Sequence, residues 1–172
     1  LFPVVEAKLG RVKRLVGTGG PSESGQLLKM SKSLNNAIFL SDDADAIKKK
    51  VMSMYTDPKR LRATDPGTTE NNPLWIFHET FNPDKNWVKE AEEKYRAGTI
   101  SDVECKKQLI EVLVNLIDPI RLRREQFASD LPQLMKILQD GTARANQIAE
   151  ETLFKAKQVM KQDYFKRKIE FV

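Results

Sequence analysis

The sequence predicts a mainly α-helical fold, in which a helical bundle follows the tail of an α/β domain. After residue 41, apolar residues recur at helical spacing, and proline, glycine and capping residues divide the stretch into segments of helix length. Before residue 41, short apolar runs flank a segment rich in glycine, serine and proline. We therefore expect three parts: a terminal piece of an α/β domain at 1–40, a helical domain at 41–165 and a basic tail at 166–172.

The first part of the chain is expected to contain one strand and a loop. Short apolar runs and a basic segment within residues 1–16 are compatible with a strand at the end of a sheet. Residues 17–25 read GTGGPSESG, a composition that predicts an irregular loop with few apolar anchors. Lys29 and Lys32 follow this loop and repel each other unless a polyanion lies between them. We therefore expect the whole segment from Gly17 to Ser33 to be poorly fixed when no polyanionic ligand is bound.

Two helices are expected next. Ser41 is a favourable N-cap for the first helix, which should end before Asp57-Pro58. A polar loop over 56–73 then leads to a short helix over 73–81, whose aromatic side chains should be buried. This helix contains His78, which we expect to be a core residue rather than a catalyst.

Proline, glycine and capping residues bound the remaining helices, which we expect over 83–98, 101–117, 119–128, 129–141 and 143–159. Ser101 and Glu104 form a capping box at the start of the second of these, a broadly apolar helix that should be central. The core is expected to consist of apolar residues that share a helix face: Ile47, Val51, Leu74, Ile76, Val112, Leu113, Leu116, Leu134, Leu138, Ile148 and Leu153.

The composition limits the class of protein. The chain has 172 residues, a net charge of +5 and one cysteine, Cys105. This length suffices for one domain with a core, and the basic balance favours a polyanionic partner. One cysteine permits neither an intramolecular disulfide nor a cysteine-based zinc site, so we expect no metal site. A reducing compartment suits this cysteine content and no apolar stretch approaches membrane-spanning length, so we expect a cytoplasmic location.

The most informative motif is the pentapeptide KMSKS at residues 29–33. Its lysines, hydroxyls and backbone N–H groups suit a polyphosphate, especially where negative charge grows on a departing phosphate. A generic basic pentapeptide is usually a solvated loop. This particular string is expected by chance in a chain of this length only on the order of once in ten thousand, which favours a functional motif.

The pentapeptide resembles the second signature of the class I aminoacyl-tRNA synthetases. This resemblance implies a Rossmann-type nucleotide-binding domain before the helices and a catalytic role for Lys29 and Lys32. Lys32 would contact the departing phosphates of ATP, and Lys29 would assist it. The ATP-binding residues that the resemblance implies are Leu15, Lys29, Met30, Ser31, Lys32 and Ser33.

The segments after the pentapeptide resemble the tryptophan-specific members of that class. The segments that carry this resemblance are TDP at 56–58, DPG at 65–67, NP at 72–73, ECKK at 104–107 and ILQDGTARA at 137–145. The resemblance implies that the parent enzyme is a homodimer that uses ATP, substrate-bound Mg²⁺ and L-tryptophan to charge tRNA(Trp). The helical domain would contact tRNA, and the candidate basic residues are Lys59, Arg60, Arg62, Arg121 and Arg124.

Two features depart from the family pattern. The first signature of the class, His-x-Gly-His, requires two histidines, and this sequence contains only His78. We therefore expect a carboxy-terminal fragment of a longer enzyme, which should be inactive alone. The stretch between Val16 and Lys29 is also longer than the short turn usual in the family. Two alternatives remain open: a tyrosyl-type synthetase of the same class, and a helical tRNA-binding module without catalytic activity.

Overall fold

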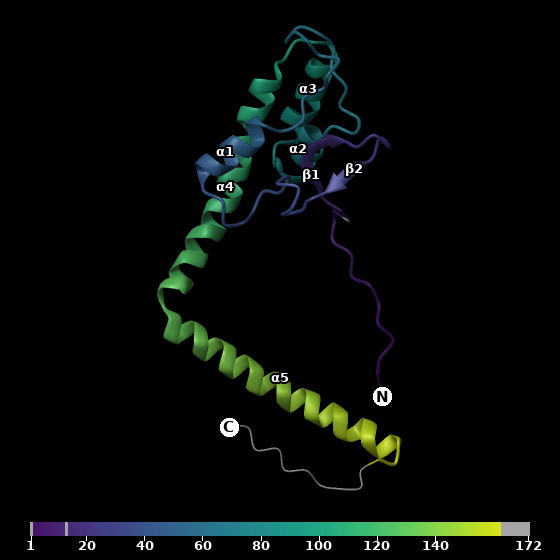
Figure 1. Ribbon diagram of the computed structural model, residues 1–172, viewed down its shortest axis with the longest axis vertical. Coiled ribbons are helices and arrows are strands. Elements are labelled where there is room, and N and C mark those ends of the chain that lie inside the picture. The colour runs from purple at the N-terminus through teal and green to yellow at the C-terminus, as the bar shows by residue number, and fades with distance from the viewer. Residues whose placement is uncertain (1, 13, 163–172) are drawn as a thin grey trace. The chain divides into compact units, whose positions relative to one another are not determined.

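The computed structural model describes residues 2–12 and 14–162 (Figure 1). The expected basic tail at 166–172 and the end of the expected helical domain at 163–165 lie outside the described residues. The chain divides into two compact units, Leu9–Glu125 and a second unit of Leu1–Lys8 with Gln126–Val172, which are described separately. The expected mainly α fold class is confirmed, and the expected division near residue 40 stays a prediction.

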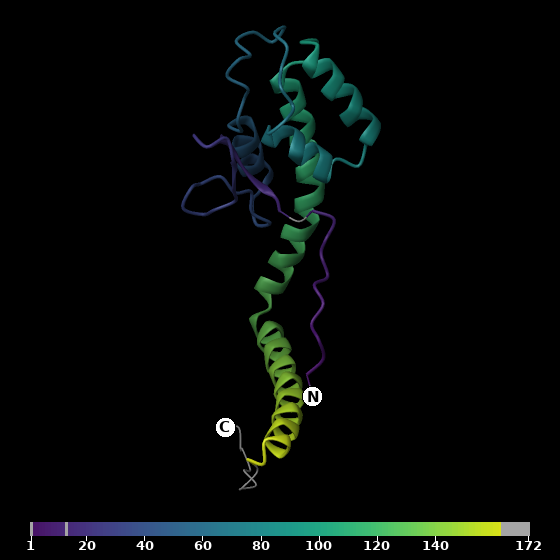
Figure 2. The ribbon, with the colours of Figure 1, turned by 90° about the vertical axis from the view of Figure 1, so that its right-hand side faces the viewer.

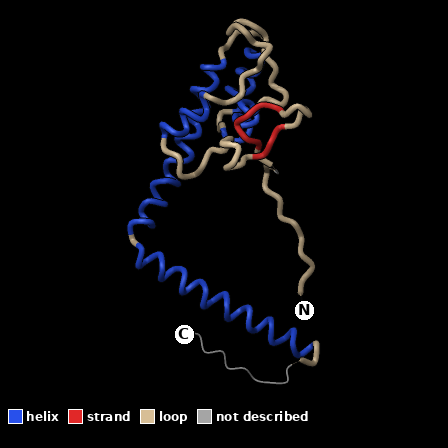
Figure 3. The backbone as a smooth tube through the Cα atoms, viewed as in Figure 1, coloured by secondary structure: helices blue, strands red, loops and turns tan. Residues whose placement is uncertain are grey.

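The unit Leu9–Glu125 contains a small hairpin and four helices. Strand β1 (Val16–Pro21) pairs antiparallel with β2 (Leu27–Lys29) (Figure 3). In this pairing Val16 lies opposite Lys29. The helices are α1 (Ala44–Met52), α2 (Pro73–Phe81), α3 (Lys85–Arg96) and α4 (Asp102–Ser129), the last of which continues past the end of this unit. Their inward faces share one core, so the hairpin is supported by a packed helical body.

The hairpin corrects the expectation of an irregular loop over 17–25. Residues 17–21 belong to β1, and only the turn around Gly25, with a φ of 77°, lies between the strands. The Thr18 N–H donates to the Asn36 carbonyl at 2.9 Å, and the Tyr55 N–H donates to the Thr18 carbonyl at 3.0 Å. These partners supply the backbone hydrogen bonds that the glycine-rich sequence could not reveal.

Two of the glycines are needed for close packing rather than for flexibility. A Cβ atom at Gly17 would overlap the side-chain amide of Asn36, and one at Gly20 would overlap the Tyr55 ring. Gly19 lies between them and has open space where its Cβ would stand. The glycine content of this segment therefore reflects a close approach of β1 to its neighbours.

The matched pair Gly17→Ala and Gly19→Ala tests this packing. Gly17→Ala should lower the free energy of unfolding by about 1–3 kcal/mol, because the added methyl group forces Asn36 or β1 to move. Gly19→Ala should change it by less than about 0.5 kcal/mol. The measurement is urea unfolding of the two variants. Equal effects would show that β1 is not packed against Asn36.

The helix starts agree with the sequence except at α1. Asp43, rather than Ser41, is its N-cap, and its Oδ1 accepts from the Ala46 N–H at 2.8 Å. At α3, Gly98 closes the helix as expected and has a φ of 71°. At α4, the Ser101 Oγ accepts from the Glu104 N–H at 3.1 Å, as in the expected capping box.

The expected helix breaks at Pro119 and Gly141 are wrong. Helix α4 runs through Pro119, where Arg121 is paired with Asp118 at 3.2 Å. Helix α5 (Leu131–Val159) runs through Gly141, and Figure 2 shows it as one continuous coil. A glycine in a helix costs only about 1 kcal/mol, which a long helix with a good cap can absorb. Asp130 provides that cap, accepting from the Gln133 N–H at 3.0 Å.

The core is centred on α1 to α4. Four expected core residues are buried, namely Ile47, Val51, Leu74 and Leu113. Ile76, Val112 and Leu134 are half-buried. Four other expectations are wrong, because these residues are exposed in the structure: Leu116, Leu138, Ile148 and Leu153. Helical spacing identifies the apolar face of a helix but cannot show whether another element covers that face.

Helix α4 is tied to the end of α1 by a buried lysine. The Lys106 ammonium donates to the carbonyls of Met52 at 3.1 Å and Met54 at 2.7 Å, and to the Thr56 hydroxyl at 3.0 Å. Burial lowers the pKa of Lys106, against the opposing effect of Asp102. These three acceptors satisfy the ammonium and close the carboxyl end of α1.

None of the helices in the described part of the chain combines the length and the apolar character needed to cross a lipid bilayer.

Candidate functional site

The KMSKS pentapeptide begins at the end of a strand and continues into a tight turn. Lys29 is the last residue of β2. The Asn35 N–H donates to the Lys32 carbonyl at 3.2 Å and closes the turn, with Asn35 in the left-handed region at a φ of 48°. The hydroxyls of Ser31 and Ser33 are 2.9 Å apart. The hairpin therefore presents both hydroxyls and both lysines within one short segment.

The side chain of Asn36 supports this turn through hydrogen bonds to its backbone. Its Oδ1 accepts from the Ser31 N–H at 2.7 Å, and its Nδ2 donates to the Lys29 carbonyl at 3.2 Å. Asn36 is buried, with 8% of its surface exposed. Sequence reasoning missed this residue, because an asparagine three positions after the pentapeptide gives no sign of where its amide points.

Both lysines of the pentapeptide, Lys29 and Lys32, are exposed. Among the described residues, neither Lys29 nor Lys32 takes part in an ion pair. Leu15 and Met30, in contrast, are half-buried and pack against the helical core. The turn thus combines an apolar base with two uncompensated cations, an arrangement that suits an anionic ligand.

The candidate tRNA contacts lie in the loop between α1 and α2 and on helix α4. Lys59 and Arg62 are exposed in the loop between α1 and α2, and Arg124 is exposed on α4. Arg121, also on α4, is half-buried and pairs with Asp118 at 3.2 Å and Glu125 at 2.7 Å. The hydrogen bond that the Arg121 guanidinium donates to Asp118, followed by the charge of Glu125, raises the pKa of Arg121.

Arg60 departs from the expectation of a tRNA contact, because its guanidinium is enclosed in the protein. It donates to the Asp65 carbonyl at 2.8 Å, the Ala63 carbonyl at 2.5 Å and the Ile100 carbonyl, and it pairs with Asp102 at 3.1 Å. None of its side-chain surface is exposed. We therefore assign Arg60 a structural role, in which it fixes the loop between α1 and α2 to the start of α4.

The same loop is also held by Asp57. Its carboxylate accepts from the Lys59 N–H at 3.0 Å and from the Thr68 N–H at 2.9 Å. Burial acts to raise the pKa of Asp57, but these N–H donors outweigh it and hold the pKa below its ordinary value. The exposed Lys59 therefore projects from a fixed backbone.

The only histidine and the only cysteine are buried beside each other. The His78 Nε2 lies 3.0 Å from the Cys105 carbonyl, which can only accept, so Nε2 carries the proton and Nδ1 accepts from the Asn82 amide at 3.3 Å. Burial lowers the pKa of His78 to about 4 and raises the pKa of the Cys105 thiol to about 12. Both groups are neutral core residues, in agreement with the expectation for His78.

The low pKa of His78 predicts a loss of stability in acid. Above pH 6.5, its ordinary pKa, the imidazole is neutral in both states and the stability is complete. As the pH falls from 6.5 towards 4, the unfolded chain binds a proton that the folded chain does not. The free energy of unfolding should therefore fall by about 3 kcal/mol over this window, and this part of the pH dependence should vanish in His78→Gln. The test is to measure the free energy of unfolding of the parent and of His78→Gln at several pH values. The same dependence on pH in both proteins would contradict the prediction.

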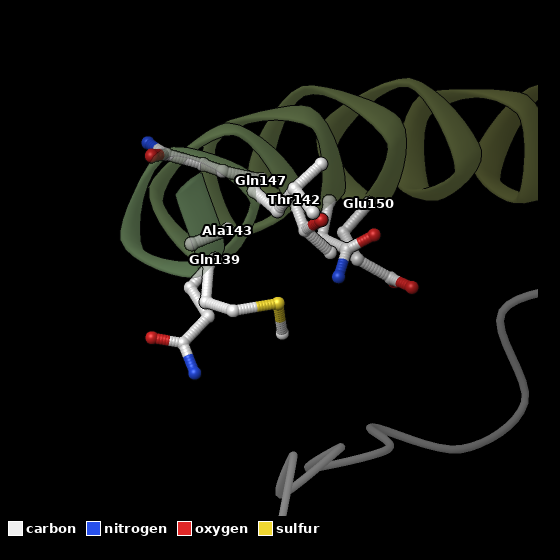
Figure 4. Close-up of a pocket in the computed structure, with 8 residues that line it drawn as sticks. Gln139, Thr142, Ala143, Gln147 and Glu150 are labelled. Carbon is white, nitrogen blue, oxygen red and sulfur yellow. The ribbon is translucent and has the colours of Figure 1, made fainter. Parts of the chain in front are cut away.

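A hollow on α5 lacks the exposed cations that the KMSKS turn presents. Its lining residues are Met135, Leu138, Gln139, Thr142, Ala143, Asn146, Gln147 and Glu150, which lie along one face of the helix (Figure 4). Of the described residues, only those of α5 line it. We therefore assign it no ligand. No group of three or more potential metal ligands occurs within residues 2–12 and 14–162.

Known proteins resemble this chain over most of its length. The tryptophan–tRNA ligase of Treponema pallidum (strain Nichols) is 42% identical over 160 residues, which are 93% of this chain and 46% of that protein. The tryptophan–tRNA ligase of Chlamydia caviae is 44% identical over 153 residues, 89% of this chain and 43% of that protein. This chain therefore spans less than half the length of these curated relatives.

A solved structure shows the same fold. Tryptophanyl-tRNA synthetase from Campylobacter jejuni, crystallised with ADP and tryptophan, matches 87% of this chain and 44% of its own length, with a TM-score of 0.69 and 27% identity. A family model for class I tRNA synthetases (W and Y) matches residues 21–118, which include the pentapeptide, the loop with Lys59 and Arg62, and most of α4. The chain belongs to this family, the class I tRNA synthetases of the W and Y group.

Proposed function

We propose that this chain is the carboxy-terminal part of a tryptophan–tRNA ligase, which activates tryptophan with ATP and transfers it to tRNA(Trp). The observation that carries the proposal is the KMSKS turn, fixed at its base and exposed at both lysines. The names of the relatives in Treponema and Chlamydia support the choice of tryptophan. The complex of the Campylobacter enzyme with ADP and tryptophan supports nucleotide binding by this fold.

The proposed role of the turn is to stabilise departing pyrophosphate. Activation joins the tryptophan carboxylate to the α-phosphorus of ATP and breaks the bond to pyrophosphate, on which negative charge grows. Lys32 supplies a cation at that charge, and Lys29 assists it. The hydroxyls and N–H groups of Ser31 and Ser33 contact phosphate oxygens, Met30 supports the turn, and Leu15 packs against adenine.

The other partners follow from the same proposal. Mg²⁺ would enter bound to the phosphates of ATP, since this small, strongly hydrated ion is usually held through substrate phosphates rather than by an all-protein cage. Lys59, Arg62, Arg121 and Arg124 contact the backbone of the tRNA, with Arg121 exchanging its carboxylate partners for phosphate. The complete enzyme is a cytoplasmic homodimer, and most of the tryptophan pocket lies outside this chain.

The alternative is a tyrosine-specific enzyme, because the matching family model covers both the W and the Y synthetases. Pyrophosphate exchange into ATP distinguishes the two. The complete polypeptide that carries this chain should exchange with tryptophan and not with tyrosine, whereas the isolated chain should exchange with neither. Exchange that depends on tyrosine would establish the alternative. Binding of tRNA without exchange by the complete polypeptide would establish a non-catalytic tRNA-binding module.

A further inference from the structure

We propose that Asn36 is a positioning residue for the KMSKS turn, a role that rests on the proposed function. Its side-chain amide joins two backbone groups of the pentapeptide, the Ser31 N–H and the Lys29 carbonyl. Through these bonds it sets the direction in which Lys29 and Lys32 leave the backbone, although Asn36 itself touches no substrate. Asn36 therefore acts on ATP through the two lysines.

The geometry of the two bonds resembles a rung of a sheet. Lys29 and Ser31 are two residues apart, and one amide donates to the first at 3.2 Å and accepts from the second at 2.7 Å. A neighbouring strand would satisfy the same two backbone groups in the same manner. The side chain thus extends the pairing of β2 beyond its last residue and into the pentapeptide.

Asn36 is itself held in place from β1. Its backbone carbonyl accepts from the Thr18 N–H at 2.9 Å, and Gly17 leaves the space that its amide fills. The turn from Lys29 to Asn36 is therefore anchored to β1 and β2 at its two ends. The tip of the turn, where Lys32 and Ser33 are exposed, lies between these anchors and is open to a ligand.

An amide suits this position better than a carboxylate. Of these two groups, only the amide can donate to one backbone group and accept from the other, because an ionised carboxylate only accepts. Aspartate would keep the acceptor for the Ser31 N–H but would lose the donor to the Lys29 carbonyl. It would also place a negative charge beneath two lysines whose proposed ligand is an anion.

Kinetics of the complete polypeptide test this role. Asn36→Ala should raise the KM for ATP in pyrophosphate exchange about tenfold, equivalent to about 1.4 kcal/mol, and should leave the KM for tryptophan within about twofold. Asn36→Asp should raise the KM for ATP at least as far. Asn35→Gly is the matched control and should behave like the parent, because glycine accepts the φ of 48° at this exposed position. An unchanged KM for tryptophan shows that the variants are folded.

Amide hydrogen exchange in the present chain supplies a readout that is independent of activity. The Ser31 amide should exchange faster in Asn36→Ala and stay protected in Asn36→Asp, which retains the acceptor. The Thr18 amide should stay protected in both, because it donates to the backbone of residue 36. Unchanged Ser31 exchange in Asn36→Ala, or a parental KM for ATP in an active enzyme, would overturn the positioning role. An inactive parent polypeptide would instead overturn the proposed function.

Discussion

Replacing Lys32 with alanine in the complete polypeptide should slow the formation of tryptophanyl adenylate by about 30- to 1000-fold. The reason is that a cation directed at a departing phosphate stabilises the transition state by about 2–4 kcal/mol. Affinity for tryptophan should change far less, because the lysine acts on the phosphates. The measurement is the pre-steady-state rate of adenylate formation, with the KM for tryptophan determined in parallel.

Lys107→Ala is the matched control for this experiment. Lys107 is exposed on α4, and its replacement by alanine removes the same positive charge from the chain as Lys32→Ala does. It should leave the rate of adenylate formation unchanged, since no ion pair among the described residues links Lys107 to the pentapeptide. A rate for Lys32→Ala within a few-fold of the parent would remove Lys32 from the catalytic residues.

Replacing Arg60 with alanine should destabilise the fold by about 3–5 kcal/mol. The substitution leaves the Asp102 carboxylate without its cation and deprives three carbonyls of a donor, those of Ala63, Asp65 and Ile100. It also removes the guanidinium that lies 4.2 Å from the centre of the Tyr95 ring. The free energy of unfolding, measured by denaturant titration, should therefore fall by a large share of the total.

Arg62→Ala distinguishes this role from a general effect of charge. Arg62 lies in the same loop, two residues further on, and is exposed. Its replacement should change the stability by less than about 0.5 kcal/mol. If Arg60→Ala were as stable as Arg62→Ala, the buried network would contribute nothing to the fold, and Arg60 would again be a candidate for tRNA binding.

Local signals in the sequence were sufficient to place most of the helices. Capping residues, a closing glycine and apolar spacing act within a few positions of each other, so the starts of α3, α4 and α5 were predictable. The continuity of α4 through Pro119 and of α5 through Gly141 was not, because each residue weakens a helix without ending it. Exposure along α5 was not predictable either, since it depends on what covers the helix.

For the candidate site, too, some features could be predicted from the sequence and others could not. The pentapeptide could be recognised from its letters, and the structure places it at the end of a hairpin that the sequence did not predict. Gly17 and Gly20 suggested flexibility, whereas in the structure they allow the backbone to approach Asn36 and Tyr55. The role of Arg60 depends on Ile100 and Asp102, about 40 positions away, so only the folded structure could separate it from the exposed Arg62.

A crystal structure of the complete polypeptide with ATP and tryptophan would test the account most directly. The account predicts that the Lys32 ammonium lies about 3 Å from an oxygen of the β- or γ-phosphate, with Lys29 beside it and with the amide of Asn36 still bonded to Ser31. Triphosphate bound away from residues 29–33, with both lysines in solvent, would contradict the central claim that this turn is the phosphate-binding element of a tryptophan–tRNA ligase.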